Sequence, residues 1–443
     1  MVGKYKAYPK YKDSGIEWLG GIPSDWTSKK IKYFTSCNDD VLSELTKKDS
    51  IIEYVDISSV SSTKGIEKTK YILFRDAPSR ARRCVQDGDI IVSTVRTYLE
   101  AITQIKNPPN NLVVSTGFAV IRGKSKIDQT FLAYALKEKT FLNKVITLSV
   151  GISYPAINTS DLISIKVSFP NIDEQKQIAN FLDHETVKID TLIEKQQQLI
   201  KLLEEKRQAV ISHTVTKGLN PNVSMKDSGV EWLGAIPEHW QTVAIGRLFD
   251  RVKRTGYAEK ELLSVYRDYG VIPKSSRDDN FNKSSQDLSS YQLVNPNDLV
   301  INKMKTWQGS IAISNYEGIV SPAYFIFKPN KKMYSHFITK YIHYLLRTPI
   351  YVSQYLARSK GIRVNQWDLD PEEFRKIKLV IPTKNEQLQS IEYIEKYEEK
   401  INKLISKAIQ QINLLKERRT TLISAAVTGK IDVRDWQAPT VTD

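Results

Sequence analysis

The sequence contains little cysteine and no long apolar run. Its 443 residues include only Cys37 and Cys84, which do not form a CxxC pair. Two thiols exclude a disulfide framework and a cysteine-rich zinc site, and they suit a reducing compartment. No uninterrupted apolar run approaches the roughly 18 residues of a membrane helix, and the N-terminal MVGKYKAYPKYKDSG lacks the apolar segment of a secretory signal. We therefore expect a soluble, cytoplasmic protein with no membrane partner.

Motifs for nucleotide hydrolysis, metal binding and base methylation are also missing. There is no GxxxxGK[ST] loop for the phosphates of ATP, and the TGK at residues 428–430 lacks the upstream glycine. The five histidines show no HExxH or comparable ligand spacing. The NPP at residues 107–109 is similar to the amine-binding motif of adenine methyltransferases, but Asn110 stands where an aromatic residue should stack on the flipped base. We expect no catalytic residue, no metal and no cofactor in this chain.

Positive charge is the main excess in the composition. Lys and Arg number 65 against 50 Asp and Glu, which gives a formal net charge of +15 and a pI of about 9.4. The hydrophobic fraction of 41% is that of a globular protein. Such an excess commonly marks a surface that binds a polyanion, with nucleic acid as the first candidate. The alternative is a basic surface that binds nothing.

The chain contains an internal repeat. KDSGIEWLGGIPSDW begins at Lys12, and KDSGVEWLGAIPEHW begins 214 residues later at Lys226, with eleven of the fifteen positions identical. Glycine and proline in each copy indicate turns. The two tryptophans of each copy are expected to pack against a neighbouring element rather than to stack on a ligand.

A second repeated pair predicts two long helices. One segment begins at Pro170 and the other at Pro382, and each has an acidic first turn and a glycine near its end, at Gly218 and Gly429. Apolar residues recur at heptad spacing, and an offset of 212 residues aligns the two copies. The shared register favours an antiparallel coiled coil between the repeats; the alternative is two amphipathic helices, each packed on its own domain. The residues expected between the helices are Leu182, Ile189, Leu192, Leu199, Leu203 and Val210 in the first copy, and Ile394, Ile401, Leu404, Ala408, Leu415 and Leu422 in the second.

The stretches between the repeated ends resemble each other only weakly. Both are rich in Ile, Val, Tyr and Phe in short runs bounded by turn residues, which indicates mixed α/β (α+β) globules with many strands. The predicted organisation is two globular domains separated by two long antiparallel helices, with a pseudo-twofold internal repeat. The expected boundaries are 1–168 and 221–380 for the globular domains, 169–220 and 381–430 for the helices, and 431–443 for a C-terminal tail.

Each globular stretch contains a strand signal followed by a polar, basic loop. QDGDIIVSTVRTYLEA has Asp89 before its apolar run, and NPNDLVINKMKTWQGS has Asp298 in the same place. An offset of 209 residues aligns Arg96, Thr97 and Tyr98 with Lys305, Thr306 and Trp307, and Gln308 follows.

This layout is similar to that of type I restriction-modification specificity subunits. The resemblance rests on the paired IP..W segments, on the helix starts at Pro170/Glu174/Gln175 and Pro382/Glu386/Gln387, and on the paired strand signals, and it covers nearly the whole chain. It implies two target-recognition domains that each read half of an asymmetric, bipartite site in double-stranded DNA. It also implies that the two helices fix the spacing and bind methyltransferase subunits, most simply two of them. Separate restriction subunits complete such a complex, and the partners supply the sites for S-adenosylmethionine, ATP and magnesium.

The loops that follow the two strand signals are the first candidates for DNA contact. A long cation can reach guanine or a phosphate, a hydroxyl can serve either, and an aromatic ring can pack on sugar or on a thymine methyl group. The alternative is a solvated strand end with Tyr98 and Trp307 in the core. Weaker basic or polar candidates for DNA contact are Arg82, Arg83, Ser153, Tyr154, Arg358, Lys360 and Arg363.

Two functions of different class remain after these observations. The first is a non-catalytic DNA-recognition subunit, and the second is an assembly scaffold whose globules bind protein and whose charge is incidental. Selective binding of one DNA sequence over competitor DNA separates them. The sequence gives no code that relates its side chains to target bases or to the length of the spacer.

Overall fold

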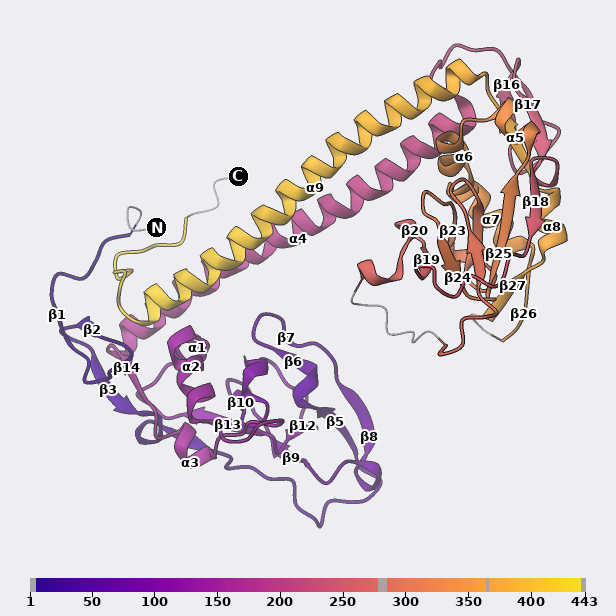
Figure 1. Ribbon diagram of the computed structural model, residues 1–443. Coiled ribbons are helices and arrows are strands. Elements are labelled where there is room, and N and C mark those ends of the chain that lie inside the picture. Colours follow the sequence, from indigo (N-terminus) through magenta and orange to yellow (C-terminus); the bar gives the residue numbers. More distant parts are fainter. Residues whose placement is uncertain (1–4, 278–284, 364–365, 440–443) are drawn as a thin grey trace. The chain divides into compact units, whose positions relative to one another are not determined.

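The computed structural model describes residues 5–277, 285–363 and 366–439 (Figure 1). The chain divides into two compact units. The first comprises Met1–Gln196 and Gln410–Asp443, and the second comprises Gln197–Ile409. Each unit therefore contains one globular stretch together with half of each long helix. The expectation of mixed α/β globules joined to two long helices is confirmed.

The globular part of the first unit is built on two four-stranded sheets. One has the order β11-β10-β13-β4 and is antiparallel; the other has the order β8-β5-β12-β9, in which β12 pairs with β5 in parallel. The helices are α1 Gln129–Leu136, α2 Lys139–Leu148 and α3 Thr159–Leu162. The strands are β1 Tyr11–Asp13, β2 Gly21–Pro23, β3 Thr27–Lys30, β4 Thr35–Cys37, β5 Ile51–Val55, β6 Val60–Ser61, β7 Gly65–Ile66, β8 Lys70–Leu73, β9 Ala81–Cys84, β10 Ile90–Ser93, β11 Ile102–Gln104, β12 Leu112–Ser115, β13 Phe118–Gly123 and β14 Lys166–Phe169.

The second unit repeats this plan with one four-stranded sheet and several two-stranded ones. Its four-stranded antiparallel sheet has the order β18-β25-β22-β23, and β22 occupies the place that β10 has in the first unit. The helices are α5 Lys331–His336, α6 Thr339–Leu346, α7 Pro349–Ala357 and α8 Pro371–Lys376. The strands are β15 Met225–Asp227, β16 Ala235–Pro237, β17 Gln241–Ala244, β18 Phe249–Val252, β19 Leu263–Tyr266, β20 Gly270–Pro273, β21 Gln292–Val294, β22 Leu299–Asn302, β23 Ile311–Ile313, β24 Gly318–Val320, β25 Tyr324–Pro329, β26 Ser359–Arg363, β27 Gln366–Leu369 and β28 Lys378–Ile381.

The aspartate before β10 and its counterpart before β22 hold the starts of these strands. The buried Asp89 carboxylate accepts hydrogen bonds from Arg122 Nε and Nη2, both at 2.8 Å, and from the backbone N–H of Gln86. Asp298 accepts from Arg254 Nη1 at 2.6 Å and from the N–H of Asn295 at 2.8 Å. A buried carboxylate requires such partners, because an unpaired charge in the interior is costly. These aspartates therefore have a structural role.

The two long helices are α4, Ile172–Lys217 with 46 residues, and α9, Lys384–Val427 with 44 residues. Asn171 caps α4 by accepting the N–H of Glu174 at 3.0 Å, and Thr383 and Glu386 form a reciprocal capping box at the start of α9. Gly218 and Gly429 follow the helix ends with φ of 82° and 71°, a conformation that favours glycine. The helix boundaries lie inside the expected ranges.

The helices α4 and α9 lie side by side and antiparallel within each unit (Figure 1). In the first unit Leu182 and Ile189 of α4 share a core with Leu422 of α9, and in the second unit Ile211 of α4 shares a core with Ile394 of α9. The helices also join the cores of their own globules, since both clusters continue into the sheets and short helices. The antiparallel pairing and the alternative of packing on the globules are thus both realised, at different places along the helices.

The expected heptad positions are half correct. Leu182, Ile189, Ile394, Ile401, Ala408 and Leu422 are buried, and Leu203, Val210 and Leu415 are half-buried. Leu192, Leu199 and Leu404 were wrongly placed between the helices, because they are 46%, 43% and 41% exposed. The second core position lies four residues after the first rather than three; Ile412 is buried there, and Ile193, Ile200 and Ile405 are half-buried. Leucines three residues on are equally apolar, so composition alone did not distinguish the two positions.

The repeated tryptophans bind the helix starts. Trp26 is fully buried and donates Nε1–H to Glu174 Oε1 at 3.0 Å, while Trp240 donates to Glu386 Oε1 at 3.1 Å. An indole N–H without an acceptor would cost about 1–3 kcal/mol when buried. Tyr8 Oη donates to the same Glu174 oxygen at 2.7 Å, and burial together with this carboxylate raises the pKa of Tyr8. The expected packing role of these two tryptophans is confirmed.

The C-terminal tail belongs to the first unit. The backbone of Asp432 forms a β-bridge with the backbone of Lys6, and the centroid of the Trp436 ring lies 5.4 Å from that of the Phe181 ring. Val433 is buried in the same core as the first globule. The tail, expected as a separate segment, therefore completes the packing around the start of α4. In the second unit the equivalent place in the repeat belongs to the chain that continues from α4 to β15.

Candidate nucleic-acid interface

The loop after β10 presents Arg96 in the first unit. Arg96 has a left-handed backbone, with φ of 53°, and it precedes a 3-10 turn at Thr97–Leu99. Its N–H donates to the carbonyl of Pro155 at 2.7 Å, and its guanidinium lies 4.7 Å from the centroid of the Tyr154 ring. This distance is within the range of a cation–π contact. Both side chains are exposed, so the pair forms a ready surface for a polyanion.

A groove of about 530 Å³ begins at this pair. Its lining contains two arginines and one aspartate, and comprises Asp56, Ile57, Ser58, Arg80, Val95, Arg96, Ser115, Thr116, Gly117 and Tyr154. Arg80 is fixed in place, because Nε donates to Tyr54 Oη at 3.1 Å and Nη2 donates to Asp56 Oδ2 at 2.5 Å. Because two nitrogens of the planar Arg80 guanidinium are held, the group has a fixed orientation, and its remaining N–H groups point in a defined direction.

The other expected contacts of the first unit divide into exposed and engaged side chains. Tyr98 is 52% exposed and Ser153 is exposed, so both can meet a ligand. Thr97 is buried, and its hydroxyl is hydrogen-bonded to Ser149 Oγ at 2.8 Å. The expectation that this hydroxyl contacts DNA is therefore contradicted by its burial.

Arg82 and Arg83 were expected at the DNA but are built into β9. Arg82 lies over the Phe74 ring at 5.0 Å and donates Nη1–H to the carbonyl of Ala81. Arg83 is half-buried, and its Nε is enclosed without a hydrogen-bond partner. Arg80 of the same basic run precedes β9, is exposed, and is the arginine of this run that lines the groove.

The corresponding loop of the second unit presents Lys305 and Gln308, which are both exposed. Thr306 is fully buried and donates its hydroxyl to the carbonyl of Asn302, so its expected contact with DNA is also contradicted. Trp307 is half-buried, with its ring centroid 5.3 Å from that of Trp367 and its Nε1–H bonded to the carbonyl of Met304 at 2.9 Å. The ring is thus neither in the core nor fully free.

The hairpin β26–β27 stands where the first unit has the loop with Tyr154. Lys360 has a side chain that is 82% exposed and lies 3.6 Å from Asp370. Arg358 is half-buried and donates Nη1–H to Gln354 Oε1 at 2.7 Å, which fixes it on α7. The side chain of Arg363 lies outside the described part of the chain. Trp367 on β27 and Tyr154 in the first unit thus both contact the loop after the central strand.

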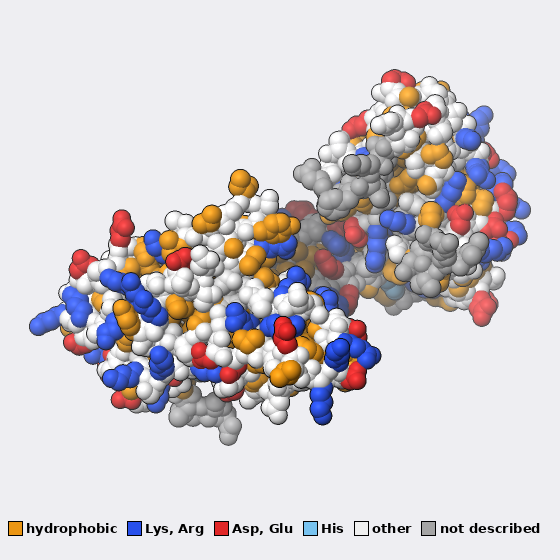
Figure 2. Space-filling view, turned by 90° about the horizontal axis from the view of Figure 1, so that it is seen from below, with side chains coloured by type: hydrophobic (Ala, Val, Ile, Leu, Met, Phe, Trp, Pro, Cys, Tyr) orange, Lys and Arg blue, Asp and Glu red, His pale blue; other side chains and the backbone are white. Residues whose placement is uncertain are grey.

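Basic charge by itself does not mark a site. On the face shown in Figure 2, Lys and Arg side chains are interspersed with acidic and hydrophobic ones on each unit. Among the described residues no group of three or more His, Cys, Asp or Glu side chains is arranged to hold a metal ion. No helix in that same part of the chain is long and apolar enough to cross a membrane.

The family model described as the type I restriction modification DNA specificity domain matches residues 23–203 and 237–414. The two matches together cover more than half of the chain. The chain belongs to this specificity-domain family.

Relatives and solved structures agree with the specificity-domain assignment. A putative type I restriction enzyme MjaX specificity subunit from Methanocaldococcus jannaschii is 27% identical over 236 residues, which are 52% of this chain and 53% of the relative. The StySPI specificity subunit of Salmonella potsdam is 23% identical over 335 residues, which are 72% of this chain and 68% of the relative. The first three curated relatives, all from M. jannaschii, are matched over about half of their length or less.

A solved structure from work on complex assembly and conformational transition of the type I R-M system covers 93% of this chain and 99% of its own, with a TM-score of 0.67 and 19% identity. At this identity the likeness concerns the fold. The two matches to the specificity-domain model correspond to the two halves of the repeat.

A second basic–aromatic cluster of this specificity-domain chain was missed from the sequence. The Arg277 guanidinium lies 5.0 Å from the centroid of the Tyr266 ring and 4.7 Å from that of Tyr269. Tyr266 ends β19, whose counterpart β5 precedes the groove residue Asp56 in the first unit. The YRDYG run at residues 266–270 interleaves tyrosine with arginine and could have indicated this cluster.

Proposed function

We propose that this chain is the DNA-recognition subunit of a type I restriction-modification complex, with one half of the target read by each unit. The observation that supports it most is a paired one. In the loops after β10 and β22 each unit carries an exposed cation: Arg96 lies against the Tyr154 ring, and Lys305 precedes Trp307 by two residues. Cations supply phosphate or guanine contacts, and aromatic rings pack on sugars and bases.

The target in this proposal is asymmetric and bipartite. Arginine offers a planar fork suited to guanine, while lysine offers a single compact charge, so equivalent loops contact different groups. Arg80, held by Asp56, extends the reading surface of the first unit, and Arg277 with Tyr266 and Tyr269 extends that of the second. Readers carried on a rigid support set the separation of half-sites by geometry.

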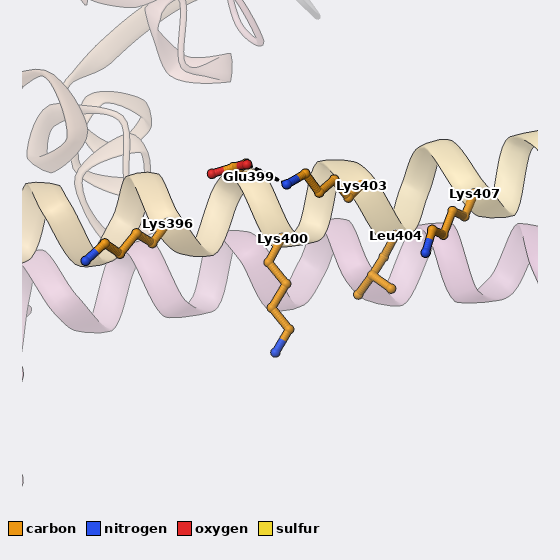
Figure 3. Close-up of a pocket in the computed structure, with 6 residues that line it drawn as sticks. All are labelled: Lys396, Glu399, Lys400, Lys403, Leu404 and Lys407. Atoms are coloured by element: carbon orange, nitrogen blue, oxygen red, sulfur yellow. Dashed lines mark hydrogen bonds and ion pairs between the residues drawn. The ribbon is translucent and has the colours of Figure 1, made fainter.

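Partners of the proposed complex supply the chemistry. Methyltransferase subunits, two in the simplest arrangement, would bind S-adenosylmethionine, and restriction subunits would use ATP and magnesium. The long helices offer them surface, because Leu192, Leu199 and Leu404 are exposed on the outer sides of α4 and α9. Figure 3 shows Leu404 among Lys400, Lys403 and Lys407 of α9, an apolar side chain surrounded by cations. The proposed chain is non-catalytic and acts in the cytoplasm.

Methylation mapping by single-molecule sequencing tests the proposal. The chain is expressed together with the methyltransferase subunit encoded beside it, and methylated motifs are compared with those of cells that lack the chain. We expect one asymmetric bipartite motif that depends on this chain. Replacement of the loop at residues 303–308 by a different sequence, with no other change in the chain, should alter the bases of only one half of the motif. A methylated motif that persists without the chain would contradict the proposal.

A further inference from the structure

A basic pocket of about 420 Å³ lies in the first unit, away from the Arg96 groove. It is bordered by the β6–β7 hairpin, the loop between β11 and β12, the helix α1 and the two long helices. It lies at the opposite end of the β10–β11 ladder from Arg96, because Gln104 pairs with Ile90 while Ile102 pairs with Val92. Four cationic residues and two acidic ones line it: Lys64, Lys106, Lys137, Arg419, Glu53 and Asp183.

Among the described residues, Lys64, Lys106 and Lys137 of this lining form no ion pair, and Lys137 is half-buried while the other two are exposed. Lys137 follows α1 as the C-cap residue, and among the described residues no hydrogen bond or ion pair involves its ammonium group. Burial, and after it the charges of Arg419 and Lys106, lower the pKa of Lys137 to about 8, while Asp183 and Asp190 act in the opposite direction. Three cations, Lys106, Lys137 and Arg419, therefore line the same pocket.

The nearby carboxylates are already engaged by other groups. Asp183 accepts a hydrogen bond from Tyr134 Oη at 2.7 Å. Asp190 accepts from Arg419 Nε at 2.9 Å and from Arg419 Nη2 at 3.2 Å. A buried ammonium with three donors and no acceptor is unfavourable, and such groups are normally paired. The lining of the pocket thus carries four cationic side chains against two acidic ones.

In the second unit, the cation at the position equivalent to Lys137 is hydrogen-bonded within the protein. Arg347 occupies the place of Lys137 at the end of α6, the counterpart of α1. Its Nη1 is hydrogen-bonded to His343 Nε2 at 2.9 Å, and its Nη2 donates to the carbonyl of Arg267. The same helix end therefore carries a cation bonded within the protein in one unit and a cation without a bonded partner in the other.

We propose that this pocket binds a phosphate group between Lys137, Lys106 and Arg419. A tetrahedral oxyanion suits several converging donors better than a single carboxylate does. The hydroxyls of Thr103 and Thr130 also line the pocket and can donate to such a ligand. Asn107 and Pro108 form part of the wall, and the N–H of Asn107 is bonded to Asp87 Oδ1 at 2.6 Å, so this NPP segment shapes the pocket. The phosphate belongs either to the backbone of bound DNA or to a free phosphate compound.

Calorimetric titration of the full chain with inorganic phosphate tests the site. Binding at pH 7.5 is expected, and Lys137→Met should weaken it by about tenfold, as loss of a charge-assisted contact does. Lys106→Met should weaken it in the same direction. Lys124→Met is the matched control, because Lys124 is exposed and does not line the pocket, and it should leave phosphate affinity unchanged. Equal phosphate affinity in the native chain and in Lys137→Met would overturn the proposal, as would equal loss in Lys124→Met.

The dependence on pH adds a second readout. Inorganic phosphate is dianionic above about pH 8, whereas the Lys137 ammonium loses its proton there, so affinity should fall as the pH rises from 8 to 9.5. The groups that face this ammonium are Arg419, Lys106, Asp183 and Asp190. Affinity that is constant over this range in the native chain would contradict a role for Lys137.

A DNA arm separates the two sources of phosphate. The titration is repeated on the chain bound to its methyltransferase partner and a cognate duplex. Loss of phosphate binding would identify the DNA backbone as the occupant, and unchanged binding would identify a free phosphate compound. The methylated motif of Lys137→Met should remain that of the native chain in either case, so the pocket and the recognition function fail independently.

Discussion

Arg419 holds Asp190 in a bidentate ion pair between the two long helices of the first unit, with Nε–Oδ1 at 2.9 Å and Nη2–Oδ2 at 3.2 Å. Both residues have counterparts 212 positions away, Arg207 and Asn402, which are joined in the second unit by one hydrogen bond of 3.0 Å. The contact is thus present in both units but differs in chemistry. The Asp190 carboxylate is charged and accepts two N–H groups of the guanidinium, whereas the Asn402 amide is neutral and accepts one through its single oxygen.

Substitutions at this pair should act in opposite directions in the two units. Asp190→Asn should destabilise the first unit by about 1 kcal/mol, a value reduced by solvent screening because the aspartate side chain is 46% exposed. Asn402→Asp should stabilise the second unit by about 0.5 kcal/mol. Urea unfolding at low and high salt measures both, and both effects should shrink at high salt. A salt-independent effect would mean that the contact is not ionic.

Neighbouring apolar residues of α9 should differ sharply in their contribution to stability. Ile401 is 3% exposed and Leu404 is 41% exposed. Truncation of a buried isoleucine costs about 2–5 kcal/mol, so Ile401→Ala should lower the unfolding midpoint strongly. Leu404→Ala should cost below about 1 kcal/mol in the isolated chain, and should weaken assembly with the methyltransferase subunit instead. Equal destabilisation by both variants would mean that Leu404 packs between the helices, as the spacing of three residues after Ile401 predicted.

Two adjacent residues of the Arg96 loop should separate recognition from folding. Arg96→Ala should weaken DNA binding and lower the slope of log affinity against log salt by about 1 if Arg96 contacts a phosphate. Thr97→Val should leave binding specificity unchanged and lower stability by about 1 kcal/mol, because the hydrogen bond between Thr97 and Ser149 is lost, while Ser149 keeps its bond to the carbonyl of Val145. Fluorescence anisotropy of the assembled complex and urea unfolding measure the two effects. Altered specificity in Thr97→Val would contradict the buried position.

Acid should destabilise the second unit through His343. Burial, and after it the charges of Arg347 and Lys340, lower the pKa of His343 to about 4, while a hydrogen bond to the backbone of Ile313 acts in the opposite direction. The unfolded chain takes up a proton at about pH 6.5, so its proton uptake exceeds that of the folded chain between pH 6.5 and 4. Stability should therefore fall over that window as the pH is lowered, by up to about 1.4 kcal/mol per pH unit. The free energy of unfolding of His343→Gln should lack this pH-dependent contribution, whereas that of His213→Gln, a substitution at an exposed site, should retain it.

Lys137 should produce the reverse situation in the alkaline range. Its folded pKa of about 8 lies below the ordinary lysine value, so the unfolded chain binds more protons between pH 8 and 10.5 and stability rises with pH there. The cost of the buried charge is complete below pH 8. Lys137→Met should therefore raise the unfolding midpoint at pH 7, and its advantage should disappear near pH 10. Calorimetry without phosphate measures the difference, with Lys124→Met as the control.

The sequence by itself determined the architecture of this protein. The repeated KDSG..EWLG..IP..W segments, the paired helix starts and the glycines after the helices depend on local rules of capping and turns, which act within a few residues. The strand signals behind Asp89 and Asp298 depend on apolar patterning in the same way. The family assignment follows from the order of these segments along the chain.

Only the tertiary structure decided which side chains face solvent at the proposed interface. Thr97 and Thr306 lie beside exposed cations in the sequence, yet each hydroxyl is turned inward to a partner that neither the spacing nor the residue type predicts. Arg82 and the groove residue Arg80 are likewise two positions apart but have different surroundings. The Lys137 pocket needed residues from α1, α4 and α9 to meet. This pocket joins α1 to a part of α9 that is hundreds of residues further along the chain, and no local preference of the chain encodes such a contact.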